Sequence, residues 1–183
     1  MPCGGEGGYP RKYARIERER RYLVERLPGA AGIGRTRRIV DRYIEGTTLR
    51  LRKQSEEGRP VVRKFTQKIP ARSAGAQQGF ITSMYVTEAE YGVLANLPAK
   101  TLCKTRYSVP PFGIDVFEGA LEGLLLAEAE FDSAAAADAL AIPPFLSREV
   151  SDDDRFTGGR LVRASGQDIR DWLLEYGMRG FSE

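Results

Sequence analysis

Charged side chains stand at every second position in several separate segments of this sequence. Glutamates alternate in one early segment and one late segment, while arginine and lysine alternate in the segments between them. The alternating residues are Glu17, Glu19, Arg21, Arg50, Arg52, Lys64, Lys68, Lys104, Arg106, Glu128 and Glu130. A spacing of two puts side chains on one face of a β-strand. The pattern therefore predicts acidic strands at the two ends of the set and basic strands between them.

A single alternating strand usually turns its polar face to water. Here the pattern recurs with the two signs on different strands, whereas a solvated surface normally mixes them. Closing the strands into a barrel places the charges in a lumen and removes unpaired strand edges. Like charges inside a lumen lose hydration unless an oppositely charged guest compensates them. The basic strands favour a polyanion such as chained phosphates, and the carboxylates favour Mg²⁺ or Mn²⁺.

The composition excludes several kinds of chemistry. There is no histidine, so a nucleophile activated by imidazole, a histidine-ligated zinc and an imidazole proton shuttle are ruled out. The cysteines, Cys3 and Cys103, form neither a CxxC motif nor a disulfide framework, which suits a reducing compartment. No apolar stretch approaches the roughly 20 residues of a membrane span, and the start of the chain lacks the apolar core of a signal peptide. We expect a cytoplasmic protein without a membrane partner.

The charge balance argues against a nucleic-acid partner. A formal net charge of +3 is mild beside the strong basic excess that such domains gather on one face. The basic run at Arg35, Arg37 and Arg38 is interpreted as a solvated surface. The expected partner is a small triphosphate or polyphosphate molecule.

A chain of 183 residues suits one domain with a sizeable core. Four glycines among the first eight positions predict a flexible lead-in at residues 1–10, followed by a single domain at 11–183. Helices are predicted at 87–97, with Thr87 and Glu90 forming a capping box, at 132–141, and at about 166–177. The last helix is amphipathic. Its apolar face is interpreted as packing against the barrel, with homodimerisation through it as the alternative.

At this point the segment 17–24 resembles the N-terminal ExExK signature of the CYTH superfamily, the triphosphate tunnel metalloenzymes. The resemblance extends in order over residues 13–162. The further matching segments are Asp41–Tyr43, Leu49–Arg52, Thr66–Lys68, Lys104–Tyr107, Ile114–Phe117, Leu126–Phe131 and Glu149–Asp153. This resemblance implies an α+β fold built on a closed eight-stranded antiparallel β-barrel, a tunnel with helices packed outside.

The resemblance also implies roles for individual residues. The residues that would ligate metal are Glu17, Glu19, Asp115, Glu128, Glu130 and Asp153, with Asp115 alternatively orienting a basic neighbour. The residues that would bind phosphates are Arg21, Arg50, Arg52, Lys68, Lys104 and Arg106. The residues that would act in catalysis are Glu19, Glu130, Asp153, Arg21 and Tyr43.

Two positions depart from the family pattern. Arg21 stands where the signature has lysine; it keeps the positive charge but cannot release a proton near neutral pH. Any acid–base role of that lysine is therefore absent or moved. Ile81 lies in a strand where relatives often place glutamates, which leaves fewer ligands for a second metal ion.

The expected function is metal-dependent hydrolysis of a triphosphate inside the charged barrel, with inorganic triphosphate as the first choice of substrate and Mg²⁺ or Mn²⁺ as the cofactor. The protein would then be a phosphoric anhydride hydrolase. One alternative on the same scaffold is an adenylate cyclase or an organic triphosphatase that acts on ATP or thiamine triphosphate. A second alternative is a barrel that binds polyphosphate without turning it over.

Overall fold

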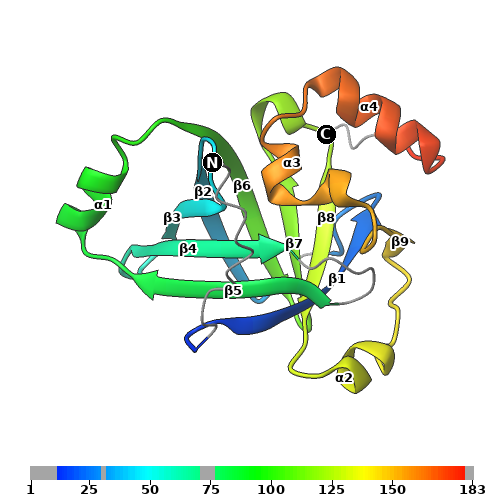
Figure 1. Cartoon of the computed structure of the whole chain (residues 1–183). Coiled ribbons are helices and arrows are strands. Elements are labelled where there is room, and N and C mark those ends of the chain that lie inside the picture. The colour runs from blue at the N-terminus through cyan, green and yellow to red at the C-terminus, as the bar shows by residue number, and fades with distance from the viewer. Residues whose placement is uncertain (1–11, 30–31, 71–76, 180–183) are drawn as a thin grey trace, which may run out of the picture.

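The computed structural model describes residues 12–29, 32–70 and 77–179, and the predicted lead-in at 1–10 lies outside them. Nine strands are found in this part of the chain. Their bounds are β1 Arg15–Val24, β2 Arg35–Ile44, β3 Leu49–Ser55, β4 Val62–Pro70, β5 Gln77–Tyr85, β6 Ala99–Val109, β7 Phe112–Phe117, β8 Leu125–Glu130 and β9 Leu146–Glu149. Eight of them pair in the order β5-β4-β3-β2-β6-β7-β8-β1, and β1 pairs again with β5. The predicted closed antiparallel barrel is confirmed (Figure 1).

The barrel closes at β1, which pairs with other strands along both of its edges. One edge of β1 pairs with β8 along Glu19–Leu23. Its other edge is divided, because Arg15–Arg18 pair with β5 and Tyr22–Val24 pair with β9. The short strand β9 is an addition to the barrel that the sequence pattern did not predict, since its four residues are too few to show a period.

The helices lie outside the barrel wall (Figure 1). Their bounds are α1 Glu88–Leu94, α2 Ala134–Asp138, α3 Gly158–Leu161 and α4 Gly166–Glu175, with single 3₁₀ turns η2 Gly119–Leu121 and η3 Asp154–Phe156. The predicted capping box of α1 is present, with Thr87 Oγ1 accepting from the Glu90 amide at 3.2 Å. No helix in the described ranges is long and apolar enough to cross a membrane.

Strand pairing shows which side chains share the lumen. Directly paired residues of antiparallel strands project from the same face of a sheet. Asp41 is paired with Arg52 of β3 and Arg106 is paired with Asp115 of β7. Arg21 is paired with Glu128 of β8. The alternating charges of several strands therefore meet inside one barrel, as the sequence predicted.

An apolar core closes one end of the lumen. The lumen-facing chains of Leu23, Leu102, Phe117 and Leu126 join residues from the C-terminal segment, and all are buried. The C-terminal residues of this cluster include Phe156, Leu161, Ile169, Leu173 and Met178. Burial of each large apolar side chain stabilises the fold by about 1.5–3 kcal/mol. The C-terminal helices are thus part of the barrel's own core.

The approach of α3 to this end depends on a glycine. A Cβ atom at Gly158 would lie 1.9 Å from Tyr43 Oη, a distance that no side chain can occupy. Further along, the Phe156 ring meets the rings of Trp172 and Tyr176 edge-on, with centroids 6.0 and 5.9 Å apart. The aromatic face of α4 packs on the barrel end, in agreement with the sequence interpretation.

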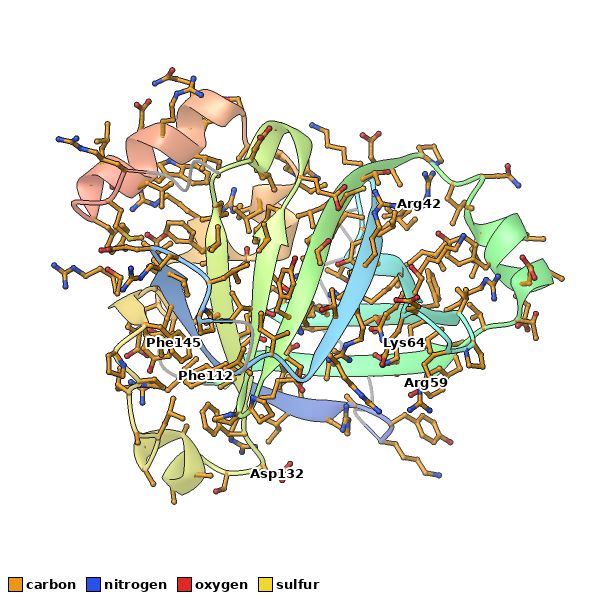
Figure 2. All side chains as sticks on the ribbon, turned by 180° about the vertical axis from the view of Figure 1, so that it is seen from behind. Arg42, Arg59, Lys64, Phe112, Asp132 and Phe145 are labelled. Carbon is orange, nitrogen blue, oxygen red and sulfur yellow. The ribbon has the colours of Figure 1, made fainter. Side chains whose placement is uncertain are left out.

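A second core covers the outer face of the wall formed by β1, β7 and β8. Phe112 and Phe145 stack edge-on there with centroids 5.9 Å apart, and Figure 2 shows them on the opposite side of the molecule from Arg59 and Lys64. The residues Tyr22, Ile114, Leu125 and Ala127 are buried in the same cluster. With both faces packed, this part of the wall provides a rigid support for the lumen charges.

Candidate phosphate and metal site

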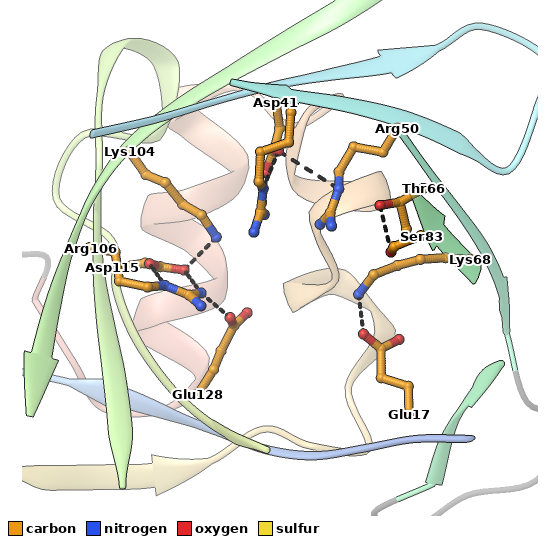
Figure 3. Close-up of polar contacts among 11 residues, drawn as sticks. Glu17, Asp41, Arg50, Thr66, Lys68, Ser83, Lys104, Arg106, Asp115 and Glu128 are labelled. Carbon is orange, nitrogen blue, oxygen red and sulfur yellow. Dashed lines mark hydrogen bonds and ion pairs between the residues drawn. The ribbon is translucent and has the colours of Figure 1, made fainter. Parts of the chain in front are cut away.

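A cluster of ion pairs occupies the lumen on the β6–β8 side (Figure 3). The Arg106 guanidinium binds Asp115 with two parallel hydrogen bonds of 2.6 Å, and Lys104 Nζ donates to the same carboxylate. Arg106 Nη2 also donates to Glu128. Asp115 is fully buried. Its two oxygens are therefore shared between two cations.

This arrangement favours one of the two roles considered for Asp115. Both carboxylate oxygens accept hydrogen bonds from Lys104 or Arg106, so a metal ion would have to displace them. The contacts fit the role of orienting basic neighbours. Asp115 holds in place Lys104 and Arg106, which are two of the predicted phosphate ligands.

Gly113 makes room for the crossing of Arg106 to Glu128. Gly113 is paired with Glu128 in the barrel wall, and a Cβ atom on it would approach Arg106 Cδ to 3.0 Å and Nε to 3.2 Å. Such a contact is tighter than side chains normally make. The glycine thus lets one arginine hold carboxylates on two neighbouring strands.

A second cluster, on β2 and β3, is centred on Asp41. Arg52 binds this fully buried carboxylate with hydrogen bonds of 2.6 and 2.7 Å, and Arg50 Nε lies 3.7 Å from it. Burial opposes the ionisation of Asp41, but the charges of Arg52 and Arg50 outweigh it and hold its pKa well below the usual range. Asp41 thus keeps two predicted phosphate ligands in place. Sequence reasoning assigned it no role, although it shares the lumen face with Tyr43, two residues later.

We expect Asp41→Asn to lower the free energy of unfolding by about 2–4 kcal/mol at pH 7. A depressed pKa in the folded state adds stability above the ordinary carboxyl pKa, and this contribution is lost as the pH falls. The difference from wild type should therefore shrink by about 1 kcal/mol per pH unit below about pH 4. Urea denaturation between pH 3 and pH 7 measures it, with exposed Asp171→Asn as the control. A difference that stays constant with pH would contradict the assignment.

The third group lies on β1 and β4. Lys68 Nζ lies 2.6 Å from Glu17 Oε1. Glu19 is 8% exposed, and burial, followed by the nearby charge of Glu128 and with a smaller part from Glu17, raises its pKa to about 7. Glu128 has the opposite behaviour, because although burial raises its pKa, Lys104 and Arg106 hold it well below the usual range. Burial and the neighbouring carboxylates therefore oppose the ionisation of Glu19 more strongly than the nearby Lys68 and Arg21 favour it.

Arg21 is held at the edge of this group. It is 2% exposed, donates from Nη2 to the carbonyl oxygen of Ser151 at 3.1 Å, and lies with Nε 3.6 Å from Glu19 Oε1. Its backbone amide donates to Ser151 Oγ at 3.0 Å. The predicted phosphate ligand is thus also a link between the lumen and the chain that follows β9.

Glu130 and Tyr43 occupy opposite ends of the site. Glu130 is exposed at the end of β8 and is paired directly with Glu19 of β1. Tyr43 packs against the apolar core at the closed end, where burial raises its pKa. The structure therefore pairs Glu130 with a lumen carboxylate and places Tyr43 at the closed end of the tunnel.

Asp153 is the predicted site residue that the structure does not bring to this group. Its carboxylate accepts hydrogen bonds from Tyr176 Oη at 2.9 Å and Arg155 Nη2 at 2.8 Å. Together with Glu149, Asp152 and other residues of the same segment it lines a separate hollow of about 640 Å³. The metal and catalytic roles of Asp153 therefore stay predictions, which these contacts do not support. Strand β9 pairs with Tyr22–Val24 on the edge of β1 that also carries β5, and after it the carboxylate of Asp153 binds Arg155 and Tyr176.

The donor set fits a hard divalent cation in chemistry. Glu19 on β1 is paired directly with Glu130 on β8, and directly opposed like charges destabilise a sheet unless a cation compensates them. Within the described ranges, however, no three acidic, cysteine or histidine side chains stand close enough to share an ion. Glu17 and Glu128 are each engaged with a lumen cation. Metal binding thus requires these ion pairs to open.

A closed antiparallel barrel with carboxylates on two adjacent strands and arginine or lysine on the facing strands is the arrangement that the resemblance to the triphosphate tunnel metalloenzymes implies. No protein-family model matches the sequence. The chain is 29% identical over 153 residues to the inorganic triphosphatase of Nitrosomonas europaea. The aligned region covers 80% of this chain and 96% of that protein.

Two solved structures share the fold. The crystal structure of the hypothetical protein NE1496 matches with a TM-score of 0.53 and 26% identity, over 81% of this chain and 99% of the other. The crystal structure of the inorganic triphosphatase NE1496 matches with a TM-score of 0.53 and 24% identity, over 82% and 96%. These similarities in sequence and fold agree with the resemblance to the CYTH superfamily that the order of the lumen motifs indicates.

Proposed function

We propose that this protein hydrolyses a triphosphate with the help of a divalent metal ion, and that inorganic triphosphate is its preferred substrate. The observation that carries the proposal is the state of Arg50. Its side chain is 9% exposed and projects into the lumen (Figure 3). Its Nε is buried without a hydrogen-bond partner among the described residues and lies 3.7 Å from Asp41 Oδ1. A buried guanidinium of this kind is ready to accept an anion.

Substrate binding can proceed by exchange of ion pairs. Lys68 and Arg106 now hold Glu17 and Glu128. Phosphate oxygens make the same charge-assisted hydrogen bonds to lysine and arginine that these carboxylates make. A triphosphate that binds the two cations would therefore release two carboxylates, and these are the ligands that a metal ion needs. Substrate and metal should thus favour each other's binding.

The metal ion, Mg²⁺ or Mn²⁺, would be held by Glu17, Glu19, Glu128 and Glu130, and when bound it supplies charge neutralisation at the phosphoryl oxygens. Arg50, Arg52, Lys104 and Arg106 hold the phosphate chain in line. Glu130, open to solvent and opposite Glu19, would orient the attacking water. No side chain needs to form a covalent intermediate. The relationship to a protein named inorganic triphosphatase supports this choice of reaction.

The direct test is phosphate release from tripolyphosphate by the purified protein with Mg²⁺ or Mn²⁺, and its loss with a chelator. Arg50→Ala should lower kcat/KM by about 10- to 100-fold, because a hydrogen bond to a charged group contributes about 1.5–3 kcal/mol. Arg63→Ala, which removes an arginine paired with Glu88, is the control and should change kcat/KM less than about twofold. Tight triphosphate binding without phosphate release under either metal would contradict the enzyme and select the polyphosphate-binding barrel.

A further inference from the structure

The open mouth of the barrel carries a second basic group beyond the lumen ion pairs. A hollow of about 340 Å³ lies where β2 begins and β3 ends. We call it the mouth hollow; its lining residues are Arg35, Arg37, Gln54, Glu56, Arg59, Pro60 and Val62. The apolar core occupies the other end of these strands. An anion that extends out of the lumen would therefore pass this hollow.

Strand alternation divides the basic run at the start of β2. Arg37 is paired with Arg106 of β6 and so shares the lumen face. Arg38 projects to the other face, where its Nη2 donates to Glu118 at 2.9 Å. The run that the sequence interpretation assigned wholly to a solvated surface thus contributes Arg35 and Arg37 to the mouth.

The charges of the mouth hollow are poorly balanced. Its one carboxylate, Glu56, lies 3.5 Å from Arg35. Three arginines line the hollow against this one glutamate, which leaves an excess of two positive charges. Arg37 Nε is buried without a hydrogen-bond partner among the described residues. Arg37 also stands directly opposite Arg106, whose own counter-charges are Asp115 and Glu128.

We propose that the mouth hollow binds the phosphates of an inorganic polyphosphate chain longer than triphosphate, as the chain leaves the lumen. The inference rests on the proposed function, which places a triphosphate among the lumen cations. Guanidinium groups suit phosphate oxygens because they offer paired donors. Arg37 joins the hollow to the lumen through Arg106. No aromatic ring stands among the described residues that line the hollow, so it lacks the stacking surface that single-stranded nucleic acids use.

Steady-state kinetics test the proposal with Arg37→Gln and Arg59→Gln. Each variant should raise KM for a long polyphosphate about tenfold and change KM for tripolyphosphate less than about twofold. Arg38→Gln is the matched control, since it removes the same charge from the neighbouring residue on the outer face. An equal effect on both substrates, or an equal effect of the control variant, would overturn the proposal.

Binding without turnover separates this proposal from the proposed function. The wild type and the variants are titrated with long-chain polyphosphate in the presence of a chelator, so that hydrolysis does not matter. Weaker binding in Arg37→Gln than in Arg38→Gln supports the mouth hollow even when the wild type proves unable to hydrolyse tripolyphosphate. Displacement of the polyphosphate by a DNA oligonucleotide at equal concentration would overturn it in favour of a nucleic-acid surface.

Discussion

Asp115→Asn is expected to lower the free energy of unfolding by about 3–5 kcal/mol. The carboxylate is fully buried and holds Lys104 and Arg106. Its loss leaves two buried cations with Glu128 as their remaining counter-charge. Breaking a buried pair is costly because the partner charge stays in a poorly hydrated site. The total free energy of unfolding of a typical domain is only about 5–15 kcal/mol. We therefore expect this substitution alone to unfold a measurable part of the protein at 37 °C.

The measurement is urea denaturation at pH 7, with Glu118→Gln as the control. Glu118 also pairs with an arginine, Arg38, but both side chains are largely exposed, and such surface pairs contribute about 0–1 kcal/mol. Adding Lys104→Met to Asp115→Asn should recover part of the loss, because it removes one of the uncompensated cations. A loss below about 1 kcal/mol for Asp115→Asn, or no recovery in the double variant, would show that the ion pairs do not hold the lumen together.

Alternation at period two predicted the faces of the strands, and from them the charged lumen. The prediction succeeded because register in a barrel is strongly constrained when one face is packed, as it is for β1, β7 and β8. The start of α1 was predicted equally well, because the capping box at Thr87 is a local signal. These features depend on residues close in sequence, where the physical rules are strongest.

The pairing of charges within the lumen could not be predicted in the same way. Alternation puts Asp115 on the lumen face but does not show that Arg106 reaches it with two hydrogen bonds. That contact depends on the space above Gly113. Asp41 was assigned no role for a related reason. It is a single carboxylate in a strand rich in arginine, so it does not fit the alternation of like charges. In the structure, such exceptions are the buried partners that keep the cations in position.

The contacts of Asp153 could not be predicted for a different reason. The residue follows a short motif that matches the family in order, and sequence order alone does not show where its side chain lies. The strand before it, β9, has four residues and pairs with the part of β1 that β5 leaves unpaired. In the structure the carboxylate of Asp153 accepts hydrogen bonds from Arg155 and Tyr176. A motif match therefore locates a segment more securely than it locates the side chains at the segment's end.

Glu19→Gln is expected to have two effects of opposite sign. It should reduce triphosphate hydrolysis by about 100-fold or more, because it removes a central carboxylate of the proposed metal site. Without divalent metal it should also stabilise the fold at high pH. Glu19 has a pKa of about 7, above the ordinary carboxyl value near 4.3. Its charged form is therefore disfavoured by the folded lumen, and glutamine resembles the protonated form.

The pH dependence follows from the direction of that shift. Well below pH 4, Glu19 is protonated in both the folded and the unfolded state, and the variant and wild type should have similar stability. As the pH rises to about 7, the unfolded chain ionises first and the wild type loses stability, about 1.4 kcal/mol per pH unit. At pH 8, Glu19→Gln should exceed the wild type by about 3 kcal/mol, measured by denaturation with a chelator present.

Exposed Glu122→Gln serves as the control and should change neither activity nor stability. A merely structural role for Glu19 predicts a less stable and less active variant at every pH. If Glu19 is instead a metal ligand, the variant should be more stable than the wild type when no metal is present. The reason is that holding the lumen carboxylates together lowers the stability of the fold until a cation and a polyanion bind. A variant that is inactive and more stable would thus show that the carboxylate that destabilises the lumen is also the one that hydrolysis requires.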